Sequence, residues 1–210
     1  MIEVRKTTSA KLGQGCLVVS LAPEDVFAVT CLLSAGGARF CGSSDPKAIA
    51  WLCEEALRPS RNAFVAEAIE DGRVVGAVLA VRRELLLGLR LCTVAPGLGV
   101  RALARLALGA LINVLLGRVS RMPNWLTSYG RRAAKVILVV TLASVRGRGI
   151  GTELYALLGN LVEGTGDAHW LIARLENTNT ISLALHKRAG WVTMPEAGSI
   201  AAWKRLRHAP

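Results

Sequence analysis

Short apolar runs alternate along the chain with longer stretches in which apolar residues recur every three or four positions. The short runs are rich in valine, leucine, isoleucine and alanine, which is typical of strands. They predict strands at residues 16–21, 62–69, 73–81, 136–142, 170–175 and 201–206. The longer stretches predict helices at residues 23–34, 44–57, 154–161 and 181–189.

Local signals indicate where several of these elements begin and end. Pro23 and Pro46 fall in the first turns of the first two helices, and Asp45 can cap the second. Glu70-Asp71-Gly72 between the second and third strands is typical of a hairpin turn. Residues 192–200 contain proline and glycine, so we expect a turn region there.

The most informative segment is the glycine-rich loop between the fourth strand and the third helix. Gly147, Gly149 and Gly151 occur within five residues, directly before the helix. Free backbone N–H groups and the positive end of a helix converge at such a loop, and glycines let an oxygen-rich ligand approach the backbone. Arg146 and Arg148 add charge suited to phosphate. The loop therefore predicts a pyrophosphate site.

The spacing of this loop differs from two other phosphate motifs. A dinucleotide loop reads G-x-G-x-x-G with an acidic residue about twenty positions later, and a P-loop contains Gly-Lys-Ser/Thr. Arg146-x-x-Gly149-x-Gly151 instead resembles the acyl-CoA loop of the GCN5-related N-acetyltransferase (GNAT) superfamily, Arg/Gln-x-x-Gly-x-Gly/Ala. Residues 179–191 are similar to the later motif of that family, Asn-x-x-Ala-x-x-Leu-Tyr-x-x-x-Gly-Phe.

The resemblance implies a fold, a cofactor and a set of binding residues. The fold is α+β, a mixed and mostly antiparallel central sheet flanked by helices, in one domain over residues 1–210. The cofactor is acetyl-CoA or a longer acyl-CoA. In the family the loop wraps the pyrophosphate, the asparagine contacts the pantetheine arm, and N–H groups of the preceding strand polarise the thioester carbonyl. The matching residues are Val139, Val140, Thr141, Arg146, Gly147, Arg148, Gly149, Ile150, Gly151, Thr152 and Asn179.

The implied reaction is direct attack of an amine on the thioester. His186 stands where the family often has a tyrosine that protonates the departing thiolate, and its unperturbed pKa of about 6.5 suits that role. A histidine hydrogen-bonded on a helix face is the alternative. The glutamate base of some relatives corresponds to Arg174 here, so Glu176, on the same strand face, and Glu67 are the candidate bases.

Residues 83–135 form a helical insertion between the hairpin and the motif-bearing strand, where a minimal family member has only a few residues. The longest uncharged piece, residues 106–117, is shorter than the roughly twenty residues that span a bilayer. Three roles stay open for the insertion: packing on the core or at a homodimer interface, a lid or wall for an acyl chain or apolar acceptor, and a helix on a membrane surface.

Charge and cysteine content bear on partners and compartment. The net charge is +11, and between residues 85 and 152 there are ten Arg or Lys residues and no Asp or Glu. Such a segment can attract an acyl carrier protein, an acidic acceptor or an anionic lipid surface, whereas its few aromatics disfavour nucleic acid. Five cysteines without CxxC spacing, and no signal-like N-terminus, predict reduced thiols in a cytoplasmic protein without a zinc site.

The sequence thus predicts an N-acyltransferase that moves an acyl group from an acyl-CoA or acyl carrier protein thioester to a primary amine of a small molecule or peptide. The apolar insertion favours a donor longer than acetyl, or an apolar acceptor. Three alternatives remain: a plain acetyl-CoA-dependent N-acetyltransferase acting on an apolar acceptor, a family member that binds acyl-CoA without turning it over, and a basic membrane-associated protein with an incidental glycine loop.

Overall fold

The computed structural model describes residues 10–12, 16–40, 44–58, 62–101, 104, 132–166, 168–196 and 198–207. The strands are β1 (Ala10–Leu12), β2 (Cys16–Ser20), β3 (Ala63–Glu70), β4 (Arg73–Val81), β5 (Ala133–Thr141), β6 (Trp170–Glu176), β7 (Val192–Glu196) and β8 (Ser199–Arg205). The α-helices are α1 (Val26–Ala35), α2 (Pro46–Ala56), α3 (Glu84–Val94), α6 (Ile150–Glu163) and α7 (Thr180–Arg188). Two 3-10 turns, η1 (Pro23–Asp25) and η2 (Ala143–Val145), precede α1 and α6.

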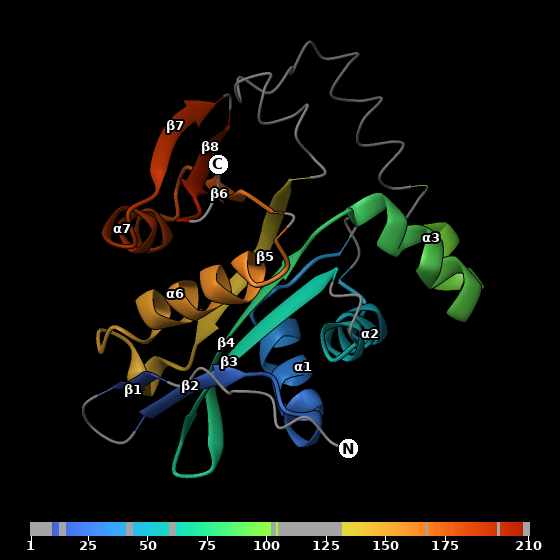
Figure 1. The fold of residues 1–210 in the computed structure, drawn as a ribbon, viewed down its shortest axis with the longest axis horizontal. Helices are drawn as coiled ribbons and strands as arrows, with labels where there is room; N and C mark the ends of the chain where they lie inside the picture. The colour runs from blue at the N-terminus through green and yellow to red at the C-terminus, as the bar shows by residue number, and fades with distance from the viewer. Residues whose placement is uncertain are drawn as a thin grey trace.

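One sheet in the order β1-β2-β3-β4-β5-β6-β8-β7 organises the described residues (Figure 1). Every neighbouring pair of strands is antiparallel except β5 and β6, which are parallel. The predicted mixed, mostly antiparallel sheet is confirmed, and every predicted strand and helix is present with its ends shifted by a few residues.

The turn region expected at residues 192–200 is wrong, because most of it is β7, paired antiparallel with β8. Only its end turns, at Gly198, which has a φ of 81°. The turn was predicted because the segment contains Pro195. Proline is accepted in a strand at the edge of a sheet, where its missing N–H breaks no ladder, and β7 is the last strand of this sheet.

Local signals elsewhere behave as expected. The Oδ1 atom of Asp45 accepts a hydrogen bond from the N–H of Lys47 at 2.9 Å and so caps α2. Asp71 and Gly72 have φ values of 50° and 72°, as a two-residue hairpin turn between β3 and β4 requires.

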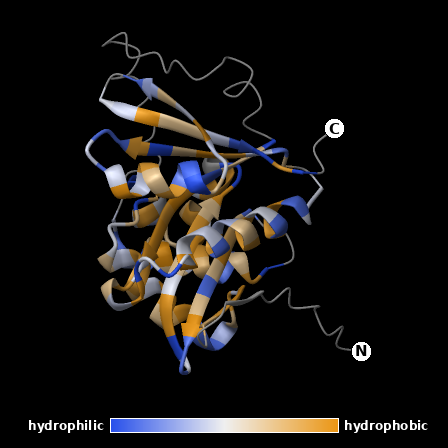
Figure 2. Ribbon diagram, turned by 90° about the vertical axis from the view of Figure 1, so that its left-hand side faces the viewer, coloured by the Kyte–Doolittle hydropathy of each residue, from blue (hydrophilic) through white to orange (hydrophobic). Residues whose placement is uncertain are grey.

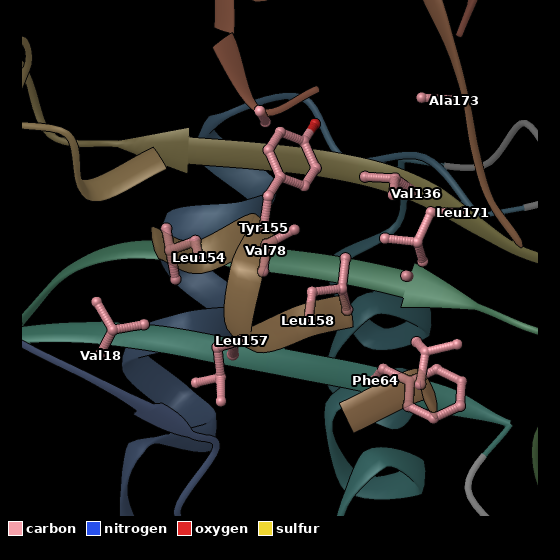
Figure 3. Packing of buried hydrophobic residues seen from close by; sticks show 14 of the residues in the cluster. Val18, Phe64, Val78, Val136, Leu154, Tyr155, Leu157, Leu158, Leu171 and Ala173 are labelled. Carbon is pink, nitrogen blue, oxygen red and sulfur yellow. The ribbon is translucent and has the colours of Figure 1, made fainter. Parts of the chain in front are cut away.

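Helices cover both faces of the sheet, and each face has its own apolar core. On one face Leu154, Leu157 and Leu158 of α6 lie in a cluster with Val18, Phe64 and Val78 of the strands (Figure 3). On the other face α1 and α2 pack on the sheet through buried residues that include Val29, Leu33, Ile49, Leu52, Val65 and Leu79. In Figure 2 the central strands are accordingly coloured as hydrophobic along most of their length.

The sheet opens between β5 and β6. These strands pair only over Ala133–Lys135 and Trp170–Ile172, although β5 continues to Thr141 and β6 to Glu176. Beyond Lys135, β5 is paired with β4 alone among the described strands, and one residue, Ile137, is skipped in that ladder as a bulge. Figure 1 shows β6 and β8 diverging from β5 beside α6. The opening places unpaired backbone at the end of β5 that leads into the glycine loop.

The described start of the predicted insertion is the helix α3. Its Leu87 and Leu91 are buried against the core beneath α1 and α2, while Leu86, Leu89 and Val94 are exposed. Residues 95–101, 104 and 132 of the predicted insertion are also described, whereas residues 102–103 and 105–131 lie outside the described residues. The predicted end at residue 135 is wrong, because Ala133–Lys135 already belong to β5. Within the described ranges, every helix is too short or too polar to span a bilayer.

Candidate functional site

The glycine loop turns sharply between η2 and α6. Gly147 and Gly149 have φ values of 81° and 82°, a left-handed conformation that other residues adopt only with strain. The carbonyl of Gly149 accepts hydrogen bonds from the N–H groups of Thr152 and Glu153 at 2.9 and 3.2 Å, so it begins the helix. Four further N–H groups of the turn donate to no group in the described part of the chain. They belong to Gly147, Gly149, Ile150 and Gly151.

These free donors meet at the positive end of a 14-residue helix. A Cβ built on Gly147 or Gly149 would touch nothing within 4 Å, so the space in front of the turn is open. The loop therefore has the free donors and the open space that the predicted anion site requires.

Gly151 serves a different purpose from the other two glycines. A Cβ there would lie 3.1 Å from Cδ2 of Leu185, a residue of α7. The absence of a side chain at Gly151 lets α7 approach α6, and this contact brings the glycine loop and the later motif together.

The two loop arginines differ in what they contact. The Arg148 guanidinium binds Glu70 at the end of β3 in a bidentate ion pair, with Nη2–Oε1 and Nη1–Oε2 distances of 2.6 and 3.1 Å. This hydrogen-bonded partner lowers the pKa of Glu70. The Arg146 side chain is exposed and forms no hydrogen bond or ion pair with any described residue. Of the two loop arginines, Arg146 is therefore the one whose charge is not paired with a carboxylate in the described part of the chain.

The end of β5 supplies further N–H groups. Leu142 donates its N–H to the carbonyl of Val75 at 2.8 Å, just beyond the pairing of Thr141 with Gly76. Since N–H directions alternate along a strand, that of Val140 points toward β4, and those of Val139 and Thr141 point toward the opening. Two of the three residues predicted to polarise a carbonyl thus face the gap between β5 and β6.

Asn179 begins α7 as its sequence predicts. Its Oδ1 atom accepts a hydrogen bond from the N–H of Ser182 at 2.9 Å, and the helix ends before Gly190, which has a φ of 76°. The Asn179 side chain is exposed, and its NH₂ group remains available to a ligand.

His186 is buried, with 1% of its surface exposed. Its Nδ1 lies 2.7 Å from the carbonyl oxygen of Ser182, and its Nε2 lies 2.9 Å from the hydroxyl of Tyr155. Because a carbonyl only accepts, Nδ1 carries the proton, and in the neutral ring Nε2 accepts from Tyr155. Burial lowers the pKa of His186 and favours this neutral form. Both nitrogens are occupied, so the geometry does not support the predicted role as general acid.

The two candidate bases have different surroundings. Glu176 is exposed at the end of β6, where its carbonyl accepts from the N–H of Asn179. Glu67 on β3 is fully buried; its Oε1 accepts from the N–H of Ala22 at 2.9 Å, and its Oε2 has no partner among the described residues. Burial raises the pKa of Glu67 to about 7.

Glu67 also lies in line with the open end of β5. It pairs with Ala77 on β4, and Ala77 pairs with Val140 on β5. Two strand spacings of about 4.8 Å each separate Glu67 from Val140 along this row. A pKa of about 7 suits Glu67 to act as a base near neutral pH.

Sequence reasoning missed Glu70 and Tyr155. The sequence pattern predicts only a hairpin turn at Glu70 and only a helix around Tyr155. Neither has a local signal, because each acts on a partner distant in the sequence. No group of three or more His, Cys, Asp or Glu side chains that could hold a metal ion occurs in the described ranges.

Comparison with known proteins agrees with this geometry. A family model described as Acetyltransferase (GNAT) family matches residues 35–191. No curated protein matches the chain.

Solved structures share the fold at low sequence identity. The yncA protein of Salmonella typhimurium, solved with its cofactor acetyl-CoA, is 14% identical over 93% of this chain and 96% of that one, with a TM-score of 0.58. The GNAT domain of S. lividans PAT is 12% identical over 98% and 100%, with a TM-score of 0.58. The ribosomal-protein-alanine N-acetyltransferase of Brucella melitensis is 18% identical over 90% and 99%, with a TM-score of 0.56.

Proposed function

Because the chain belongs to the GNAT family of acetyltransferases, we propose that it transfers the acetyl group of acetyl-CoA to the primary amine of a small molecule or peptide. The observation that carries the proposal is the continuity of the free N–H groups. Those of the glycine loop lie at the start of α6, and those of Val139 and Thr141 lie on β5, which is joined to the loop through η2. This arrangement can hold a pyrophosphate at one end and a thioester carbonyl at the other.

The cofactor would be held by residues whose surroundings leave them available. The N–H groups of Gly147, Gly149, Ile150 and Gly151 bind the pyrophosphate together with the guanidinium of Arg146. Thr152 lines the same turn, and the NH₂ group of Asn179 reaches the pantetheine arm. Acetyl-CoA, when bound, supplies the thioester. The residues of the chain hold this thioester in the orientation that the amine must attack.

The chemical step is direct aminolysis. The neutral amine attacks the carbonyl carbon, the carbonyl oxygen takes up negative charge near the N–H groups of Val139 and Thr141, and the C–S bond then breaks as the C–N bond is completed. Glu67 accepts the proton of the amine through bound water, because its free Oε2 and pKa of about 7 suit a base near neutrality. The thiolate of CoA is protonated from solvent.

The donor is proposed to be short because α1 closes one side of the acyl end. A Cβ at Gly36, the residue after α1, would lie 2.9 Å from Cδ2 of Leu138 and 3.1 Å from Cγ2 of Val140. These two side chains flank Val139 and face α1, so little room remains there for a long chain. The acetyl-CoA bound to the Salmonella structural relative supports the same choice.

The test is a panel of donors: acetyl-CoA, octanoyl-CoA, palmitoyl-CoA and an acetyl-loaded acyl carrier protein, assayed by thiol release with a set of primary amines. We expect transfer from acetyl-CoA and much slower transfer from the longer thioesters. Faster transfer from octanoyl-CoA would overturn the short-donor proposal. Saturable binding of acetyl-CoA without transfer to any amine would favour a non-catalytic binder.

A further inference from the structure

We propose that Glu70 is a positioning residue for the glycine loop. Its ion pair with Arg148 holds the turn in the conformation that presents the free N–H groups, and Arg148 stays on Glu70 when the anion binds. This inference rests on the proposed binding of acetyl-CoA at the loop.

A glycine-rich loop without a fixed point would be mobile. Arg148 stands between Gly147 and Gly149, the two residues with positive φ, and glycine loses more conformational freedom on ordering than any other residue. Val145 and Ile150, on either side of the turn, are buried. Arg148 supplies the fixed point between them, through two charge-assisted hydrogen bonds.

Glu70, the partner of Arg148, lies on a rigid part of the sheet. Glu70 pairs with Cys16 on β2 and with Arg73 on β4, so its backbone is held by the sheet on both sides. The same β4 strand holds the start of the loop, because the carbonyl of Val75 accepts the N–H of Leu142. The hairpin thus fixes the loop at two points. One of them, the Glu70–Arg148 ion pair, joins residues that are 78 positions apart in the sequence.

The ion pair also removes the negative charge of Glu70 from the surroundings of the loop. Arg148 and Glu70 neutralise each other, with side chains 28% and 21% exposed. A carboxylate beside the loop would repel a pyrophosphate bound there unless Arg148 remained in place. The intact ion pair therefore favours binding of the pyrophosphate in two ways. It holds the conformation of the loop, and it neutralises the charge of Glu70.

A competing account makes the opposite prediction. If Arg148 were a phosphate ligand that rests on Glu70 only when the site is empty, Glu70 would compete with the cofactor. Removing its charge would then tighten binding. The sign of the change for Glu70→Gln separates the two accounts.

The experiment measures acetyl-CoA dissociation constants by calorimetry for the wild type, Glu70→Gln, Arg148→Met and the double variant. Asp71→Asn is the matched control, since it removes one negative charge from the adjacent turn residue, which contacts no loop arginine. We expect Glu70→Gln to weaken binding by about tenfold, as for the loss of a charge-assisted hydrogen bond. The double variant should bind acetyl-CoA no more weakly than the poorer single variant. Asp71→Asn should bind it as the wild type does. The KM for the amine should not change in any variant.

A second measurement keeps the inference separate from the proposed function. Amide hydrogen exchange of the peptide covering residues 143–153 is followed without ligand. Faster exchange in Glu70→Gln but not in Asp71→Asn is expected if the pair orders the loop. Unchanged or tighter acetyl-CoA binding by Glu70→Gln, or unchanged exchange, would overturn the inference. A wild type that binds no acetyl-CoA would instead defeat the proposed function.

Discussion

The hydroxyl of Tyr155 lies 2.9 Å from Nε2 of His186, and the two rings meet edge to face with their centroids 5.0 Å apart. Trp191 completes the cluster, 4.8 Å from the His186 ring and 5.2 Å from that of Tyr155. The pair joins α6, which starts at the glycine loop, to α7, which carries the later motif. His186 therefore forms part of the interface between the two motif helices.

Replacing His186 should affect stability more than chemistry. His186→Leu removes two hydrogen bonds and leaves the Tyr155 hydroxyl buried without a partner, so we expect the free energy of unfolding to fall by about 1–3 kcal/mol. Urea denaturation measures this. Tyr155→Phe should cost a similar amount, and the double variant less than the sum of the two. A loss of kcat in His186→Leu with unchanged stability would restore the general-acid role.

Acid should destabilise the protein through His186. Its folded-state pKa lies below the usual value, so the unfolded chain takes up a proton at a higher pH than the folded protein does. The contribution to stability is complete above about pH 6.5 and is lost as the pH falls below it. Melting curves from pH 8 to pH 5 should show a decline in Tm that is smaller in His186→Leu. Equal slopes in the two proteins would contradict the buried neutral histidine.

Glu67→Gln should separate catalysis from stability. Glutamine can still accept from the N–H of Ala22 but cannot take a proton, so we expect kcat to fall by about 100-fold and the acid limb of the pH–rate profile near pH 7 to disappear. The stability of the variant, in contrast to its kcat, should exceed that of the wild type at high pH. The raised pKa means that the wild type loses stability as the pH rises from 4.5 to about 7, whereas the variant does not.

At pH 8 the Glu67→Gln variant should therefore unfold at a higher temperature than the wild type. Glu176→Gln is the control, because that side chain is exposed at the end of β6. Wild-type activity in Glu67→Gln, with loss of activity in Glu176→Gln, would transfer the role of base to Glu176.

Shortening Leu138 should widen the range of donors. Leu138→Ala opens the contact between β5 and the end of α1 at Gly36, and we expect a rise in kcat/KM for butyryl-CoA and hexanoyl-CoA relative to acetyl-CoA. A buried Leu-to-Ala change costs about 2–5 kcal/mol, and less is expected here because Leu138 is only half-buried. An unchanged donor preference would mean that the acyl chain does not approach this contact.

The sequence predicted the features that depend on neighbouring residues. The turn at Gly149, the cap at Asn179 and the hairpin at Asp71-Gly72 follow from local backbone preferences, and all three are present. Features that depend on distant contacts were not predictable. Arg148 has the composition of a phosphate ligand, and only the position of the hairpin shows that it binds Glu70. The neutral state of His186 likewise depends on Tyr155, a residue of another helix.

The central claim is that the turn at Gly149 binds the acyl donor. The most direct measurement is a calorimetric titration of acetyl-CoA into the wild type and into Gly149→Glu, which places a charged side chain in the open space before the loop. The account predicts saturable binding at one site in the wild type and none in the variant, with an unchanged circular dichroism spectrum. No binding by the wild type, or equal binding by the variant, would contradict it.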